Sequence, residues 1–208
     1  MRKSYLIAII VSVALGLIVL FLLLPTQPKS DIDKVNDLMA DNRKSAGMPS
    51  SADSVKIQQA IQLVNGTEPM KGIQMLLAMV EENPKNVEAH FVLGEFAIRS
   101  RQMEKAVARF NTIIELQPQN ITAYIYKGEA LTRMDSLESA LASFNAAIAI
   151  DSTYGIALVY AGKMNEQLGN WDKAKSLYKQ ILRHNEDPVV KDSVNAFIKK
   201  IDIKLNNK

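Results

Sequence analysis

Residues 87–120 read VEAHFVLGEFAIRSRQMEKAVARFNTIIELQPQN, and residues 121–154 read ITAYIYKGEALTRMDSLESALASFNAAIAIDSTY. The two stretches carry a glycine, an alanine and an aromatic residue at matching places, and residues 155–188 continue the pattern. The matching sets are Gly94, Gly128 and Gly162; Ala106, Ala140 and Ala174; and Phe110, Phe144 and Tyr178. The interval between neighbouring members is the same in all three sets. A fixed period of about 34 residues predicts a stack of two-helix units, so function is to be sought in the binding of partners.

The same register extends beyond these three stretches. One period earlier, Ala60, Gly72 and Leu76 stand at the matching places, and Pro84 lies one period before Pro118. We therefore expect four units, at residues 53–86, 87–120, 121–154 and 155–188. Residues 189–208 follow as a C-terminal helix that begins a fifth unit and caps the stack.

Small residues and turn residues agree with this division. The glycine of each first helix and the alanine of each second helix are expected where the two helices cross, because small side chains allow close approach. Gly169 stands where a helix must stop, and Asn170 is placed to cap the next helix. Pro84 and Pro118 are expected just after helix ends, where they prevent continuation of the helix.

The chain resembles the tetratricopeptide repeat family over residues 53 to about 205. The resemblance is carried by Leu93, Gly94, Ala106, Phe110 and Pro118 in the second unit, and by the equivalent glycine, alanine and aromatic residues of the third and fourth. It implies an all-α, right-handed α-solenoid. The family's early tryptophan is absent, and Lys127 replaces the usual leucine before Gly128. The places of the tryptophan are taken by Lys56, His90, Tyr124 and Leu158.

The N-terminus carries a second signal, a run of 20 uncharged residues from Tyr5 to Leu24. A helix of this length spans about 30 Å, the thickness of the hydrocarbon layer of a bilayer. Arg2 and Lys3 precede the run, so the positive-inside tendency keeps the N-terminus in the cytoplasm. Residues 1–24 are thus expected to be a single-pass signal-anchor, with the repeats in the periplasm or outside the cell. A cleaved signal peptide is the alternative, although the run is longer than such peptides require.

Residues 25–52 are expected to be a linker, since proline, glycine and serine recur there. A stretch from Ile32 to Met39 has apolar residues spaced for one or two amphipathic helical turns. Two alternatives stay open for it, packing on the first repeat unit and lying on lipid.

Composition and motifs point away from several function classes. The chain has 25 basic and 22 acidic residues, which gives no general attraction for nucleic acid. It has no cysteine, and its two histidines, His90 and His184, occupy non-equivalent repeat positions. No phosphate-binding loop, nucleophile elbow or paired histidine motif is present. We expect no enzyme activity, no cofactor and no metal site.

The resemblance implies instead a concave groove formed by the first helices of successive units. Carried onto this chain, the family's groove positions give an apolar stripe of Ile57, Phe91, Ile125 and Val159, with charged residues beside it. The full set of expected protein-binding residues is Ile57, Ile61, Phe91, Glu95, Ile98, Arg99, Ile125, Glu129, Arg133, Val159, Lys163 and Glu166.

Two interpretations of this stripe are open. In one, the apolar residues bind an extended or helical peptide, and the rows of Glu and Arg fix its register. In the other, neighbouring helices partly cover Phe91 and Ile125. The pairs Glu95 with Arg99 and Glu129 with Arg133 are then ordinary helix-surface pairs.

The last segment, Asp187 to Lys208, has apolar residues on one helical face and lysines on others. It is expected to cover the exposed edge of the fourth unit; contact with anionic lipid or another protein is the alternative.

The expected function is therefore that of a membrane-anchored, exported scaffold that binds a protein or peptide partner without chemistry. The chain is similar to membrane-anchored bacterial repeat proteins of envelope protein assembly and translocation. The alternative is a structural protein whose repeats assemble into homo-oligomers at the membrane.

Overall fold

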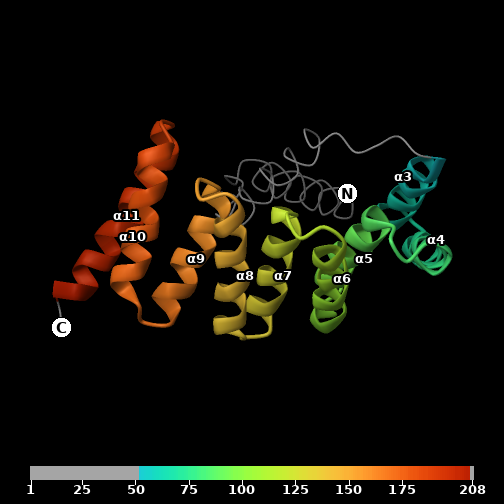
Figure 1. Ribbon diagram of the computed structural model, residues 1–208, viewed down its shortest axis with the longest axis horizontal. Helices are drawn as coiled ribbons and strands as arrows, with labels where there is room; N and C mark the ends of the chain where they lie inside the picture. The colour runs from blue at the N-terminus through green and yellow to red at the C-terminus, as the bar shows by residue number, and fades with distance from the viewer. Residues whose placement is uncertain (1–51, 207–208) are drawn as a thin grey trace, which may run out of the picture. The chain divides into compact units, whose positions relative to one another are not determined.

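The computed structural model describes residues 52–206, which fold into nine α-helices without any strand (Figure 1). The predicted anchor, residues 1–24, and the linker up to residue 51 lie outside the described residues. The helices are α3 (Ala52–Asn65), α4 (Pro69–Glu82), α5 (Val87–Arg99), α6 (Met103–Leu116), α7 (Ile121–Arg133), α8 (Leu137–Ile150), α9 (Gly155–Gln167), α10 (Trp171–His184) and α11 (Pro188–Asn206). Across residues 52–206, none of these helices combines the length and hydropathy that crossing a bilayer requires.

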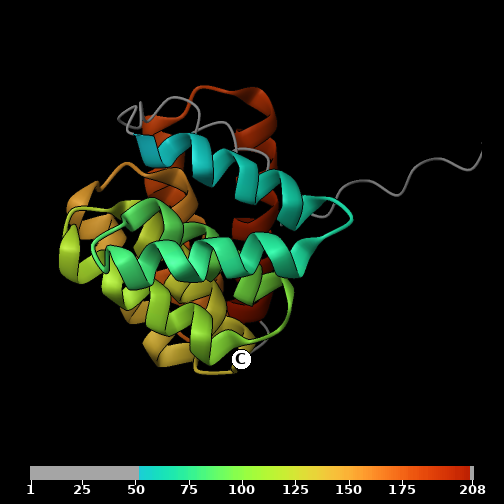
Figure 2. The ribbon, with the colours of Figure 1, turned by 90° about the vertical axis from the view of Figure 1, so that its right-hand side faces the viewer.

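The helices follow one another as four pairs and a final single helix. Each helix packs on the one before it and the one after it in the sequence. The turned view in Figure 2 shows α3 and α4, the first pair, lying side by side. The expectation of an all-α helical repeat is confirmed. We call α3, α5, α7 and α9 the first helices, and α4, α6, α8 and α10 the second helices.

The periodic glycines make room for aromatic rings. A Cβ atom built on Gly128 would lie 2.4 Å from Cε1 of Phe144, whose side chain is fully buried. Gly94 stands in the same relation to Phe110, and Gly162 to Tyr178. Each of these glycines lies against the second helix of its own unit, and its nearest neighbour there is an aromatic ring, which the sequence did not indicate. The aromatic ring of the second helix fills the space.

In the first unit the glycine and the alanine change places between the two helices. Ala60 of α3 stands where the later units have glycine, and Gly72 of α4 stands where they have alanine. A Cβ atom built on Gly72 would lie 2.5 Å from the backbone oxygen of Ala60. Here the two backbones approach directly, as expected from the sequence. Leu76 is fully buried at the place where the later units carry a ring.

Each aromatic ring also reaches the following unit. Phe110 stacks on Tyr126 of α7 with ring centroids 5.3 Å apart, and Phe144 stacks on Tyr160 of α9 at 5.0 Å. Tyr178 lies 5.2 Å from Phe197 of α11. One side chain thus fixes the packing within its own unit and the distance to the next.

The connections between units end and restart helices as their residues suggest. Pro84 and Pro118 follow the ends of α4 and α6. The side chains of Asn86 and Asn120 accept hydrogen bonds of 3.0 Å from the third residue beyond them, which caps α5 and α7. Asn170 stands at the same kind of position before α10 but makes no capping hydrogen bond, so that expectation is wrong.

Within three units, the turn between the two helices needs a left-handed residue. Arg101, Asp135 and Gly169 have φ angles of 60°, 57° and 74°, and each is one repeat period from the next. Only Gly169 adopts this conformation without a steric penalty.

The last helix, α11, packs on α10. It buries Val194 and Ile201 in a cluster with Leu158, Tyr178 and Ile181. The apolar face of α11 therefore covers the apolar edge of the fourth pair of helices.

Candidate protein-binding surface

The residues expected to bind a partner lie on the first helices, but they differ widely in exposure. Five of them are buried, namely Ile57, Phe91, Ile98, Ile125 and Glu129. Ile61, Glu95, Val159, Lys163 and Glu166 are partly exposed, and Arg99 and Arg133 are exposed. The surface that this part of the chain offers is thus mostly polar, with aliphatic side chains at Ile61 and Val159.

The apolar stripe is largely part of the protein interior. The Phe91 ring packs edge-on against Phe110 at 5.7 Å and against Tyr126 at 5.1 Å, and its exposed fraction is 6%. Ile57 belongs to the core cluster formed by α3, α4 and α5. Ile125 is 1% exposed, which leaves Val159 as the partly exposed member of the stripe. For Phe91 the structure favours the second interpretation, in which neighbouring helices cover the ring.

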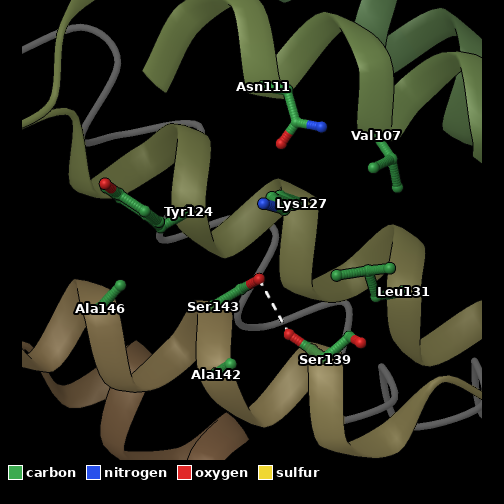
Figure 3. A pocket seen from close by; sticks show the side chains of 9 residues that line it. All are labelled: Val107, Asn111, Tyr124, Lys127, Leu131, Ser139, Ala142, Ser143 and Ala146. Atoms are coloured by element: carbon green, nitrogen blue, oxygen red, sulfur yellow. Dashed lines mark hydrogen bonds between the residues drawn. The ribbon is translucent and has the colours of Figure 1, made fainter. Parts of the chain in front are cut away.

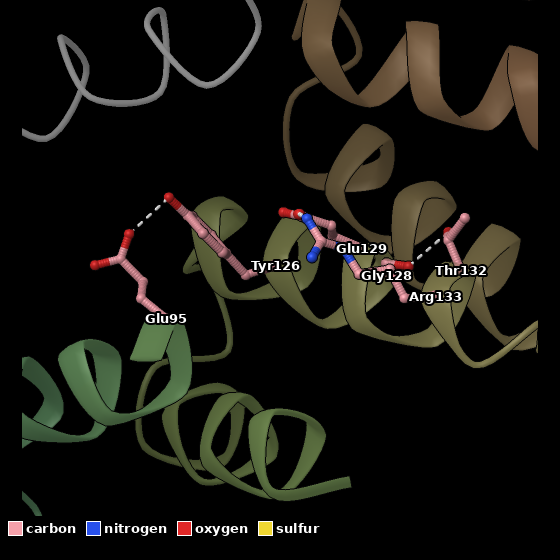
Figure 4. Close-up of polar contacts among 6 residues, drawn as sticks. All are labelled: Glu95, Tyr126, Gly128, Glu129, Thr132 and Arg133. Carbon is pink, nitrogen blue, oxygen red and sulfur yellow. Dashed lines mark hydrogen bonds and ion pairs between the residues drawn. The ribbon is translucent and has the colours of Figure 1, made fainter. Parts of the chain in front are cut away.

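Polar side chains connect successive first helices. Arg99 of α5 donates a hydrogen bond of 2.8 Å to the side-chain oxygen of Asn65 in α3. The hydroxyl of Tyr126 in α7 donates one of 2.9 Å to Glu95 of α5, as Figure 4 shows. The pairing of Glu95 with Arg99 that the sequence suggested is absent from the contacts of the described residues. These contacts instead link one unit to the next.

Glu129 and Arg133 do form the expected pair on one helix, with an Nη2 to Oε1 distance of 2.6 Å (Figure 4). Glu129 is 9% exposed, and burial raises the pKa of its carboxyl above the ordinary value, against the opposing effect of Arg133. Burial and the nearby Glu129 carboxylate also raise the pKa of the Tyr160 hydroxyl. Arg133 is therefore held in place by a partly desolvated carboxylate.

The end of this surface is closed by α11. Glu166 accepts a hydrogen bond of 2.7 Å from the Tyr178 hydroxyl and one of 2.8 Å from Lys200. The Lys163 ammonium lies 5.6 Å from the centre of the Phe197 ring. Sequence reasoning missed Lys200 and Phe197 as partners, although both lie one repeat period after the residues they contact. Extending the repeat register into α11 gives these two pairs.

Tyr126 was also missed, and it joins Phe91, Phe110 and Glu95 in one contact group. Its sequence signal is weak, because the equivalent position holds Val92 in the unit before and Tyr160 in the unit after.

His90 has a structural role. Arg109 can only donate, so its 3.3 Å contact with Nδ1 makes that nitrogen an acceptor, and Nε2 donates to the backbone oxygen of Pro84 at 2.9 Å. Burial, more than the nearby Arg109 charge, lowers the pKa of His90. His90 thus fastens the turn between α4 and α5 to α6. Across residues 52–206, no group of three or more His, Asp or Glu side chains is placed to hold a metal ion.

Comparison with known proteins agrees with this architecture. Two tetratricopeptide repeat models match the chain, one at residues 57–121 and 97–155 and the other at residues 156–187. The chain belongs to the tetratricopeptide repeat family. Among curated protein sequences there is no match.

Solved structures share the fold at low sequence identity. A tetratricopeptide repeat protein from Parabacteroides merdae superposes with a TM-score of 0.65 at 20% identity, over 74% of this chain and 61% of that one. MamA superposes with a TM-score of 0.57 at 19% identity, over 71% of this chain and 88% of its own. The TPR2B domain of yeast Sti1, solved in complex with pHsp70, gives 0.52 at 16% identity, over 57% and 97%.

Proposed function

We propose that this tetratricopeptide repeat domain binds a segment of another protein along its first helices and that residues 5–24 hold it at the outer face of a membrane. The surface concerned is formed by the exposed and partly exposed residues Ile61, Glu95, Arg99, Arg133, Val159 and Lys163. We call it the first-helix surface.

The observation that carries the proposal is the pair of exposed arginines. Arg99 and Arg133 occupy the same position in consecutive units, and each is oriented by a hydrogen bond, to Asn65 and to Glu129 respectively. An oriented guanidinium loses less conformational freedom on binding, and its planar fork pairs with carboxylates in two parallel hydrogen bonds. A protein segment with carboxylates at matching spacing fits this surface. The Sti1 domain in complex with pHsp70 supports the use of the fold for protein binding.

The membrane part of the proposal rests on the sequence. The 20 uncharged residues from Tyr5 to Leu24 follow Arg2 and Lys3, a pattern that orients a span with its N-terminus inside. Such a protein would recruit its partner during envelope protein assembly or translocation. The test is a C-terminal fusion to a phosphatase that is active only outside the cytosol. Phosphatase activity supports the orientation, and an inactive fusion beside a fluorescent cytosolic reporter contradicts it.

Partner binding is tested by site-specific photo-crosslinking of the full chain in its native membrane. A photoreactive residue replaces Arg99 or Arg133 in two variants. A third variant carries it at Glu104, an exposed residue of a second helix, as the matched control. We expect the same adduct from both first-helix sites and not from the control, and loss of the Arg99 adduct in the Arg133→Glu variant. Equal adducts from all three sites, or adducts insensitive to Arg133→Glu, would contradict the proposal.

The second candidate function is self-association through α11. Val189 and Ile203 are 70% and 54% exposed, and they lie at equal distances along the helix on either side of the exposed Ala196. These three residues share one face of the helix, opposite the buried face. In an antiparallel pair of α11 helices centred on Ala196, Val189 would meet Ile203 of the second copy, and Asp192 would meet Lys200.

Sedimentation of the full chain over a range of concentrations separates the two candidates. A dimer that becomes a monomer on Ile203→Glu substitution supports self-association. A monomer at every concentration contradicts it and leaves the first-helix surface as the proposed site.

A further inference from the structure

A pocket opens between α6, α7 and α8, where the second unit meets the third. Its volume is 460 Å³, within the range of about 300 to 1,000 Å³ common for ligand pockets. Figure 3 shows its walls, with Asn111 from α6, Lys127 and Tyr124 from α7, and small side chains from α8. The full lining is Val107, Asn111, Tyr124, Lys127, Leu131, Ser139, Ala142, Ser143 and Ala146. None of these residues belongs to the first-helix surface.

The third unit lacks a pair of side chains that pack together across the first and second helices at this place in the neighbouring units. In the second unit the equivalent places hold His90 and Arg109, which contact each other. In the fourth they hold Leu158 and Leu177, which belong to one apolar cluster. In the third unit the places hold Tyr124 and Ser143, and the Ser143 hydroxyl turns back to the backbone oxygen of Ser139 at 3.0 Å. Ser143 of α8 is smaller than Arg109 and Leu177, the residues at the same place in the neighbouring units.

Lys127 is the second departure at this place. The equivalent residues of the neighbouring units, Leu93 and Ala161, are buried with exposed fractions of 6% and 0%. Lys127 is partly buried, and no acidic side chain among residues 52–206 pairs with its ammonium group. An anion that enters the pocket therefore gains a charge-assisted hydrogen bond with Lys127 and displaces no other carboxylate of the described chain.

The rest of the lining defines the ligand further. The Asn111 amide extends into the pocket on the side where Lys127 lies, whereas the Tyr124 hydroxyl points away from Lys127 (Figure 3). The aliphatic part of the lining comes from all three helices, with Val107 on α6, Leu131 on α7, and Ala142 and Ala146 on α8. The pocket thus combines one cation with neutral polar side chains and aliphatic side chains.

We infer that this pocket binds an acidic side chain together with an adjacent aliphatic side chain from an extended segment of a partner protein. The carboxylate pairs with Lys127 and the aliphatic group rests on the alanines of α8. The inference goes beyond the function proposed above and does not depend on it, because the pocket and the first-helix surface share no residue, although α7 contributes to both.

The test measures binding of a dye-labelled, amidated peptide, Gly-Leu-Glu-Leu-Gly, to the full chain in lipid nanodiscs by fluorescence anisotropy. A second peptide carries glutamine in place of glutamate. We expect the glutamine peptide to bind about tenfold more weakly, since a charge-assisted hydrogen bond is worth about 1.5 to 3 kcal/mol. Lys127→Leu should weaken binding of the glutamate peptide by a similar factor and make the two peptides equivalent.

Two further variants locate the binding. Ser143→Leu places in α8 the residue found at the equivalent position of α10, and it should abolish binding while Lys127 remains. Lys173→Leu removes an exposed lysine of α10 and should leave binding unchanged. Circular dichroism checks that each variant is folded.

Equal binding of the two peptides, binding that persists in Ser143→Leu, or no binding at millimolar peptide overturns the inference. Arg99→Glu distinguishes the two sites, because loss of peptide binding in this variant assigns the peptide to the first-helix surface and not to the pocket.

Discussion

Replacing Gly128 by alanine tests how the units are held together. The new Cβ atom would lie 2.4, 2.6 and 2.9 Å from three atoms of the Phe144 ring. The ring is fully buried and stacked on Tyr160 of the next unit, so it cannot move without disturbing α9. Either the ring or the helix must shift by about 1 Å to restore ordinary contact.

Two effects of opposite sign determine how much Gly128→Ala changes the free energy of unfolding. Overpacking a close-packed site destabilises by about 1 to 3 kcal/mol, and the confined ring favours the upper half of that range. Alanine is favoured over glycine inside a helix by about 1 kcal/mol. The net expectation is a loss of about 1 to 2 kcal/mol in the free energy of unfolding.

The assay is urea unfolding of the full chain followed by circular dichroism. Gly155→Ala is the matched control, because nothing lies within 4 Å of a Cβ atom built there, and it should leave stability unchanged or slightly raised. Leucine in place of Phe144 removes the ring atoms that the new Cβ atom would meet. The double variant Gly128→Ala with Phe144→Leu should therefore lose less free energy of unfolding than the sum of the two single losses. Additive effects, or a Gly128→Ala variant as stable as the control, would refute the reasoning.

Three further predictions concern turns, caps and pH. Gly169→Ala should lower the free energy of unfolding by about 1 kcal/mol through its φ of 74°, whereas Arg101→Gly should raise it by roughly 0.5 kcal/mol; urea midpoints measure both. Asn120→Ala should destabilise by about 1 kcal/mol through loss of its cap, and Asn170→Ala should have a clearly smaller effect, as thermal unfolding will show. The pKa of His90 is lowered in the folded chain, so the unfolded chain binds a proton at this residue more readily than the folded chain does. The free energy of unfolding should therefore fall as the pH drops below about 6.5. His90→Gln should weaken this pH dependence, which urea titrations at several pH values measure.

The fold could be predicted because each unit repeats the same burial requirement. Fully buried positions such as Ala106, Ala140 and Ala174 tolerate little variation, so they mark the period in the sequence. The partner of each glycine could not be predicted, because the sequence gives the side of the helix but not which neighbouring side chain fills the space. The predicted cap at Asn170 was wrong for a similar reason. Capping depends on the geometry of the backbone and the side chain, which the residue type does not determine.

The candidate site could be predicted only in part. The sequence placed Phe91, Arg99 and Arg133 on the first helices, and all three lie there. It did not distinguish the buried Phe91 from the exposed arginines, because exposure depends on how closely α6 and α7 approach that ring. The pocket beside Lys127 could not be predicted for the same reason, since it depends on the distances between helices. The missing leucine was visible in the sequence, but the space opposite it depends on three helices.

The sequence by itself determined the class of fold, its period and its membership of a repeat family, because periodic burial imposes periodic residue types. It also carries the prediction of an N-terminal membrane anchor, which lies outside the described residues. The tertiary structure decided which of the repeated positions form the core and which remain accessible. It also decided that α11 pairs Lys200 with Glu166 and that the second and third units leave a pocket between them. These features depend on distances between helices, which packing sets through side chains that lie far apart in the sequence.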